Sequence, residues 1–373
     1  MKQEVIYRLN EILGDEFELI HRSRFRKSLI FRADADAVDD LQLSGLIANL
    51  MNHGFLPNID QRRDQIFIHI TAESSKKKPR IWINILLFIL TILSTMMAGA
   101  VLIGKAFLFD IQNAYFGWKY SLAILTILTA HEFGHYFAAR YHKIKATLPY
   151  YIPFPGTLFG TLGAFIRLKS PVQNRKALLD VGVAGPIAGF VFSLLFLIIG
   201  YWQLPDREGI IRFVETIHPW DMQGEGINMV LGKSLLFAFF NDVVGGGRLP
   251  MNELYHFPFI FAGWIGLLVT SINLMPIGQL DGGHVLYALA EKKARLVGIG
   301  AFALLILLNV VLILQYFSFV WVLWIILIFV LIGFRHPPTI NDHMRLDTAR
   351  SLVGWFCLIL FILCFPPLPI YIY

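Results

Sequence analysis

The chain has 373 residues, of which 56% are apolar and only 16% are charged. This composition excludes an ordinary soluble protein of this length and indicates that a lipid bilayer surrounds most of the chain. The formal net charge is +6, but the basic residues cluster beside apolar stretches without a nucleic-acid-binding motif, so we expect no nucleic-acid partner and attribute the excess to orientation in the membrane.

Residues 1 to 78 mix polar and apolar positions, and we expect them to form a small α/β domain of four or five elements. Two runs, Lys27 to Ala33 and Gln65 to Thr71, have the character of β-strands, and Asp39 to His53 has helical spacing. A polar linker, Glu73 to Lys78, ends this domain just before the first apolar stretch. Its lysines favour the cytoplasmic side of the membrane, so we expect a cytoplasmic N-terminus.

Residues 79 to 373 are expected to form a mostly α-helical, polytopic membrane domain with about six to eight transmembrane helices. Seven crossings would place the most basic loops on one side, although the stretches near 257–289 and 297–334 could be broken helices or hairpins. The expected spans are about 81–104, 118–140, 178–201, 257–280, 297–316, 318–334 and 349–366.

One connection, Thr147 to Asn174, is apolar and aromatic but contains several prolines and glycines, so it cannot be a continuous helix. Irregular backbone at membrane depth is tolerated only where protein or a water-filled cavity satisfies its polar groups. We therefore predict a re-entrant, β-like segment with a short strand near Gly163 to Leu168. The alternative is a cytoplasmic loop that lies on the lipid headgroups.

Within the second expected span, the run ILTAHEFGHYFAAR places a carboxylate and two imidazoles where lipid-compatible residues are expected. On a helix His131 and His135 lie four residues apart on one face, so their nitrogens can hold one cation. Glu132, adjacent to the first of these ligands, can reach a metal-bound water as a general base. A helix with two ordinary core histidines is the alternative, but buried polar groups at bilayer depth need partners.

A catalytic zinc ion usually takes three protein ligands, so a third must come from elsewhere in the chain. The best candidate is Asp281, in the run SINLMPIGQLDGGHVLYAL, with Asn273 and Pro276 upstream. The proline interrupts helical hydrogen bonding and the glycines after Asp281 permit a sharp departure, so the carboxylate can turn inward. The alternative is that Asp281 marks a helix terminus at the membrane edge.

These motifs resemble the site-2 protease family of intramembrane zinc metalloproteases (peptidase family M50). The hallmarks are HExxH in one transmembrane helix and Asn-x-x-Pro-x-x-x-Leu-Asp-Gly in a later one, and both occur here without departure. The stretch FGTLGAFIRLKSPVQNRKALLDVGVAGPIAGF further resembles the branch that contains bacterial members and the plant chloroplast homologues related to ethylene-dependent gravitropism, the gravitropism-deficient-yellow-green proteins. The resemblance covers roughly residues 81 to 366.

The resemblance implies Zn²⁺ held by His131, His135 and Asp281, with Glu132 as the base and Asn273 assisting through its amide donor. The implied reaction is hydrolysis of peptide bonds within or near transmembrane segments of membrane-anchored substrates. His284 is either a neighbour of the metal ligands or a polar residue on a helix face. The small residues of the DVGVAGPIAG stretch, together with its Asp180, are expected to be structural.

The β-like segment directly follows the metal-binding helix, so we expect Gly163, Ala164 and Phe165 to bind an unwound substrate segment by strand addition. Two rival functions remain: a catalytically silent relative with a binding or chaperone-like role, and a metal transporter. The start of the chain lacks the pattern of a signal peptide, which favours a bacterial inner (cytoplasmic) membrane, although a processed organellar chain would look similar. The oligomeric state, the substrate and the role of residues 1 to 78 are left open.

Overall fold

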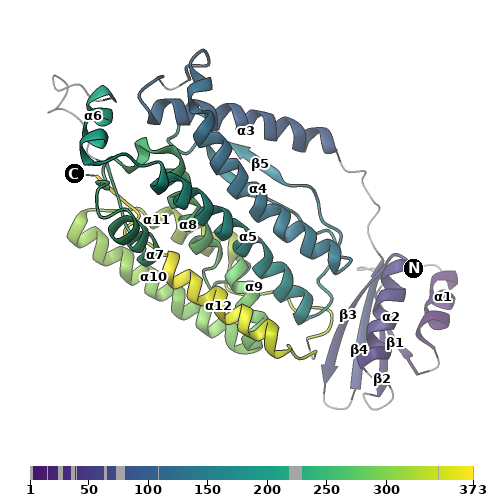
Figure 1. Cartoon of the computed structure of the whole chain (residues 1–373). Helices are drawn as coiled ribbons and strands as arrows, with labels where there is room; N and C mark the ends of the chain where they lie inside the picture. Colours follow the sequence, from purple (N-terminus) through teal and green to yellow (C-terminus); the bar gives the residue numbers. More distant parts are fainter. Residues whose placement is uncertain are drawn as a thin grey trace. The chain divides into compact units, whose positions relative to one another are not determined.

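The computed structural model describes most of the chain in two compact units, and each is treated separately (Figure 1). The first unit contains Met1–Pro79, Ser170–Lys176 and Pro337–Arg345, and the second contains the remaining residues. The expected linker Glu73 to Lys78 lies outside the described residues. The described residues are 3–14, 16–23, 28–34, 38, 40–62, 65–72, 80–107, 109–217, 229–342 and 344–372.

The first unit is an antiparallel sheet with two helices. The strands follow the order β1-β2-β4-β3. Alternate residues of β4, Ile66, Ile68 and Ile70, are buried, as expected for a sheet with one face on a core. We expected four or five elements, but the described residues of this unit form six, because β1 and β3 carry too many polar residues to be recognised by hydropathy. They are α1 (Gln3–Leu13), β1 (Glu18–Ser23), β2 (Ser28–Asp34), α2 (Asp40–Asn52), β3 (Phe55–Arg62) and β4 (Gln65–Ala72).

The second unit, called the membrane unit below, is mostly helical. Its longer helices are α3 (Ile81–Leu102), α4 (Trp118–Tyr141), α5 (Arg175–Trp202), α6 (Arg207–Ile217), α8 (Pro258–Asn273), α9 (Asp281–Ala290), α10 (Ala294–Tyr316) and α12 (Thr348–Cys364). The shorter elements are α7 (Leu235–Ala238) with the π-helical turn Phe239–Val244, α11 (Val322–Leu327) with the π-helical turn Ile328–Ile332, and the 3₁₀ turns Ala114–Gly117, Leu254–His256 and Glu291–Lys293. A two-stranded sheet joins β7 (Met229–Leu231) to β8 (Ile370–Ile372).

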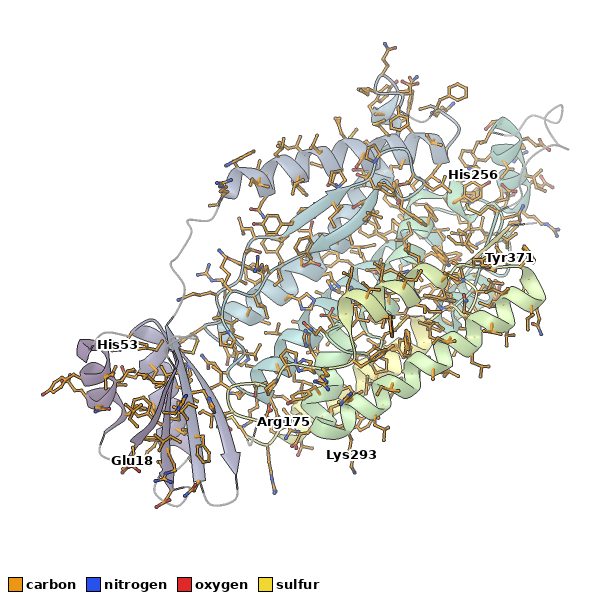
Figure 2. All side chains as sticks on the ribbon, turned by 180° about the vertical axis from the view of Figure 1, so that it is seen from behind. Glu18, His53, Arg175, His256, Lys293 and Tyr371 are labelled. Atoms are coloured by element: carbon orange, nitrogen blue, oxygen red, sulfur yellow. The ribbon has the colours of Figure 1, made fainter. Side chains whose placement is uncertain are left out.

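Three described helices, α3, α5 and α10, are long and apolar enough to cross a membrane. Together with the composition, they make the chain an integral membrane protein. The helix α4 has the length but carries charged residues at both ends and in its second half. The expected span 257–280 is broken, since α8 ends at Asn273 and α9 begins at Asp281. Figure 2 shows His256 and Tyr371 at one end of the membrane unit and Lys293 at the other.

The irregular connection after α4 is a β-hairpin made of β5 (Tyr150–Pro153) and β6 (Thr161–Phe165). The predicted strand at Gly163 to Leu168 was therefore placed about two residues too late. The sequence was ambiguous there because pairing continues irregularly beyond β6, with an isolated bridge between Ala146 and Leu168. Side chains of α3 hold the hairpin: Asn84 donates to the Pro149 carbonyl at 2.8 Å, and Ser94 donates to the Gly160 carbonyl at 2.6 Å.

Candidate metal centre

Three polar side chains of α4 lie in the interior of the membrane unit. His131, Glu132 and His135 are only 4%, 6% and 7% exposed. The two histidines are one helical turn apart, and their Nε2 atoms lie 3.1 Å from each other. The predicted pairing of these imidazoles on one helix face is therefore present in the structure.

Asp281 reaches the same place from the far side of a helix break. It is the first residue of α9, and Leu280 before it is extended. A Cβ on the next residue, Gly282, would overlap the Leu274 carbonyl oxygen at the end of α8, so only glycine allows the chain to fold back this tightly. Gly278, within the turn, has φ +54°, which also favours glycine. The break in the apolar stretch thus turns the carboxylate inward.

The three donor atoms form a compact triangle. Asp281 Oδ2 lies 3.4 Å from His131 Nε2 and 3.2 Å from His135 Nε2. Zinc binds such atoms at about 2.0 to 2.1 Å, and tetrahedral geometry then separates them by about 3.3 to 3.4 Å. The observed separations of 3.1 to 3.4 Å fit one zinc ion with a fourth position left open. Two imidazoles and a carboxylate also suit the ion chemically.

The helix α5 fixes the orientation of His135. The Val181 carbonyl accepts a hydrogen bond from His135 Nδ1 at 2.7 Å, which leaves Nε2 directed at the other donors. A Cβ at Gly185 would overlap His135 Nε2, and a Cβ at Gly189 would lie 3.2 Å from His131 Nδ1. The glycines that we expected to be structural therefore form the wall of the metal centre. The role of the Val181 carbonyl could not be predicted from the sequence, because every residue has a main-chain carbonyl and the identity of the side chain does not indicate which one holds the histidine.

Asn273 and the hairpin complete the surroundings of the centre. Asn273 Nδ2 lies 3.2 Å from His131 Nε2. The main chain of Ile166, directly after β6, lies near the Glu132 carboxylate. The Tyr151 hydroxyl of β5 lies 2.8 Å from Thr129 Oγ1 on α4. The structure thus places the segment that holds Gly163, Ala164 and Phe165 beside Glu132.

His284 pairs with a histidine that the sequence did not single out. Its Nδ1 lies 2.5 Å from His336 Nε2, and the two rings are perpendicular. The His336 ring also stacks on Tyr287. A lone histidine far along the chain gives no signal of such a contact in the sequence.

A charged cluster ties α4, α5 and α12 together. Asp180 accepts from His142 Nε2 at 2.8 Å and from two nitrogens of Arg350 at 2.8 to 3.1 Å. Arg350 also pairs with Asp347, the N-cap of α12. The Arg350 main-chain N–H and then its side chain lower the pKa of the Asp347 carboxyl. This cluster joins the end of the metal-binding helix to α5 and α12.

Comparison with known proteins gives a consistent result. The model of peptidase family M50 matches residues 119–314. The chain is 30% identical over 250 residues to the probable zinc metalloprotease EGY2, chloroplastic, of Arabidopsis thaliana, covering 67% of this chain and 41% of that protein. It is 29% identical to EGY1 of the same plant, over 65% of this chain and 42% of the relative. With EGY2 of Oryza sativa subsp. japonica it is 33% identical, over 46% of this chain and 29% of the relative.

The chain thus spans less than half the length of these curated relatives. No solved structure matches the chain significantly.

Proposed function

The chain belongs to peptidase family M50, and on this premise we propose that it is an intramembrane zinc endopeptidase that hydrolyses peptide bonds within or near transmembrane segments of membrane-anchored proteins. The observation that carries the proposal is the convergence of three zinc-compatible donors from two separate helices, with the Glu132 carboxylate beside them. A binding protein has no need of a buried carboxylate next to a ligand set with an open position. The relatives described above are named as probable zinc metalloproteases.

Each residue of the centre has a proposed role. His131, His135 and Asp281 hold the zinc, which when bound supplies a Lewis acid that polarises the scissile carbonyl and acidifies water. Glu132 accepts the proton of the attacking water and then passes it to the leaving amine. The Asn273 amide donates a hydrogen bond to the oxyanion that develops on the carbonyl. Its position 3.2 Å from His131 Nε2 supports this assignment.

The strand β6 has the features of a substrate-binding edge. Within the described residues its only strand partner is β5, and its Leu162 side chain is 64% exposed. A substrate helix hides its carbonyls in internal hydrogen bonds, so it must unwind before hydrolysis. Pairing with the main chain of Gly163, Ala164 and Phe165 would hold the unwound segment extended. The nearness of the Ile166 main chain to Glu132 supports a position of this edge next to the proposed base.

A matched pair of variants tests the edge. Ala164→Pro removes a main-chain N–H and should reduce cleavage with zinc content unchanged, whereas Ala164→Val keeps the N–H and should retain cleavage. Equal activity of both variants, with intact folding, would reject the strand-addition role.

The arrangement in the membrane is also part of the proposal. Besides α3, α5 and α10, four apolar helices are shorter than a full crossing: Leu235–Val244, Pro258–Asn273, Val322–Ile332 and Thr348–Cys364. The last three of these, together with α4, would complete a set of seven crossings. We place residues 1 to 78 as a separate small domain on the cytoplasmic side, and the membrane domain, residues 79 to 373, in a bacterial inner membrane. Fusion of a reporter enzyme to each loop would test this topology.

The decisive experiment measures cleavage of single-span membrane substrates by the purified protein, with zinc determined on the same samples. Wild type is compared with Glu132→Gln and with chelator-treated protein. Loss of cleavage in both, with zinc retained by Glu132→Gln, is the expected result. Cleavage that survives Glu132→Gln would contradict the assigned base, and bound zinc without cleavage of any substrate would favour a silent relative. Zinc flux into proteoliposomes would instead indicate a transporter.

A further inference from the structure

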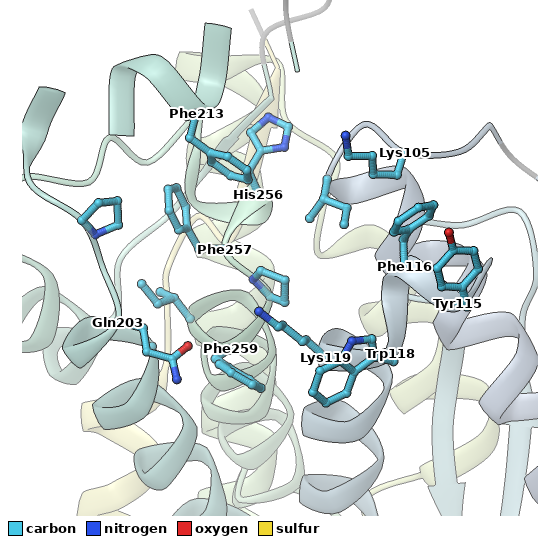
Figure 3. A pocket seen from close by; sticks show the side chains of 15 residues that line it. Lys105, Tyr115, Phe116, Trp118, Lys119, Gln203, Phe213, His256, Phe257 and Phe259 are labelled. Atoms are coloured by element: carbon cyan, nitrogen blue, oxygen red, sulfur yellow. The ribbon is translucent and has the colours of Figure 1, made fainter. Parts of the chain in front are cut away.

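A second site lies away from the metal centre, at the end of the membrane unit where α3 and α5 end and α4 and α8 begin. A cavity of 550 Å³ opens there between aromatic and aliphatic side chains (Figure 3). Four apolar helices begin or end beside this cavity, so the cavity lies at the depth of a membrane–water interface. Its lining includes Lys105, Trp118, Lys119, Gln203, Phe213 and Phe257.

The lining of the cavity contains two lysines and no acidic side chain, and Glu253, outside the lining, lies 3.4 Å from Nε2 of the lining residue His256. Lys105 and Lys119 both line it and are exposed, and no ion pair of either lysine occurs among the described residues. The nearest acid in the connecting loop, Asp110, accepts hydrogen bonds from the Asn113 side chain and main chain. Figure 3 shows Lys119 extending from α4 into the cavity. The site is therefore suited to an anion.

The rim of the cavity identifies the medium around it. In the loop between the two lysines, Phe107, Phe109 and Ile111 are 86%, 64% and 70% exposed, and Tyr115 and Trp118 are also exposed. A run of exposed aromatic and aliphatic side chains is unfavourable in water but is typical of a segment that lies among lipid headgroups and upper acyl chains. The anion that reaches the lysines is thus presented by the bilayer.

An apolar groove continues from the cavity along α4. Its volume is 640 Å³, and Trp118 lines both spaces. The groove extends from Trp118 to Phe133, about 22 Å along the helix, which exceeds the roughly 15 Å depth of one leaflet. Its three hydroxyl groups are satisfied within the protein, since Ser121 pairs with Thr95, Thr126 with the Leu122 carbonyl and Thr129 with Tyr151. The surface of the groove is therefore almost entirely apolar.

We propose that this composite site binds an anionic phospholipid, with the phosphate paired to Lys119 and Lys105 and one acyl chain lying in the groove between α3 and α4. The charged cavity and the apolar groove meet at Trp118, as the head and tail of one amphiphile require. The site involves none of the metal ligands, although Ala130 and Phe133, which flank His131 and Glu132 in α4, line the far end of the groove.

Native mass spectrometry of the purified protein in detergent tests the headgroup. Phosphatidylglycerol should be retained in preference to phosphatidylcholine with identical acyl chains. Each lysine near a phosphate contributes about fivefold in affinity, so the double variant Lys105→Gln/Lys119→Gln should weaken phosphatidylglycerol binding about 25-fold. The matched control Lys169→Gln removes an exposed lysine elsewhere and should bind as wild type does. The proposal would be overturned if the double variant retained phosphatidylglycerol as well as wild type does, or if wild type bound phosphatidylglycerol and phosphatidylcholine equally.

Two further binding measurements test whether an acyl chain lies in the groove. Leu122→Trp fills the groove without changing charge and should weaken retention of phosphatidylglycerol severalfold; unchanged retention would contradict placement of a chain there. Glycerol phosphate, which has the headgroup without acyl chains, should neither bind nor displace the lipid. Displacement by glycerol phosphate at millimolar concentration would show that the site takes a free phosphate ester, and the lipid assignment would fail.

Discussion

The helix α4 meets α5 and α3, two of the helices packed against it, in different ways. Against α5, glycines bring the backbones so close that a methyl group would overlap a metal-binding imidazole, and a carbonyl and a carboxylate hold His135 and His142. Against α3, one hydroxyl pair and one close glycine contact are followed by a 640 Å³ groove. The α5 side leaves the two imidazoles no room to shift, whereas the α3 side leaves an open groove along the helix. This difference leads to four predictions of decreasing size.

The largest effect is expected from removal of the third donor. Asp281→Ala leaves two imidazoles, which do not satisfy a catalytic zinc site, so the purified variant should lose its zinc and fall to background cleavage. Atomic absorption and a substrate assay measure the two quantities. Full zinc content in the variant would show that the carboxylate is not a ligand.

The second prediction tests the close approach of α5. Gly185→Ala places a methyl group on His135 Nε2, so the ring must move away from the other donors. Loss of this kind of support typically costs 10- to 100-fold in metal affinity. A chelator competition assay measures it.

Gly300→Ala on α10 is the matched control, because a Cβ there meets no atom within 4 Å. The control should bind zinc as wild type does. If Gly185→Ala also bound zinc with wild-type affinity, α5 would be able to move away from His135 at little cost. The close contact on the α5 side would then not determine the position of the imidazole.

The metal ligands and the contacts that position them differ in how far they could be predicted from the sequence. HExxH predicts two ligands on one helix face because a helical turn fixes their spacing, and the helix break before Asp281 follows from proline and glycine chemistry. The contact between Gly185 and His135 depends on how two helices approach, and no local pattern encodes that distance. The Val181 carbonyl has no side-chain signature at all. The ends of most long helices lie close to the ends of the apolar stretches, because a helix surrounded by lipid must present apolar side chains. The stretch 257–280 is the exception, since α8 ends at Asn273.

The hairpin and the first unit show where local patterns fail. The strand β6 was predicted two residues late because the apolar residues Ile166 and Leu168 extend the strand-like pattern past the paired segment, and only pairing with β5 selects Thr161–Phe165. In the first unit, β3 (FLPNIDQR) is polar and contains a proline. Its strand state comes from pairing with β4 along the edge of the sheet, which is tertiary information.

The third prediction concerns the charged contact on the α5 side. Asp180→Asn removes a carboxylate that accepts from His142 and Arg350, leaving two donors with a weaker acceptor. Hydrogen bonds to partly buried charges contribute about 2 kcal/mol, so the melting temperature should fall by several degrees. Asp347→Asn changes a more exposed partner of the same arginine and should have a smaller effect. Equal shifts would place the main contribution in the Arg350 and Asp347 pair instead.

The smallest effect is expected on the α3 side. Thr95→Val removes a hydroxyl 2.7 Å from Ser121 Oγ while keeping the shape of the side chain. Hydrogen bonds between transmembrane helices average about 0.6 kcal/mol, because the separated helices find other partners for these groups. The melting temperature should therefore fall by only a degree or two, less than for Asp180→Asn. A larger loss for Thr95→Val would reverse the comparison, since it would mean that α3 holds the metal-binding helix more firmly than α5 does.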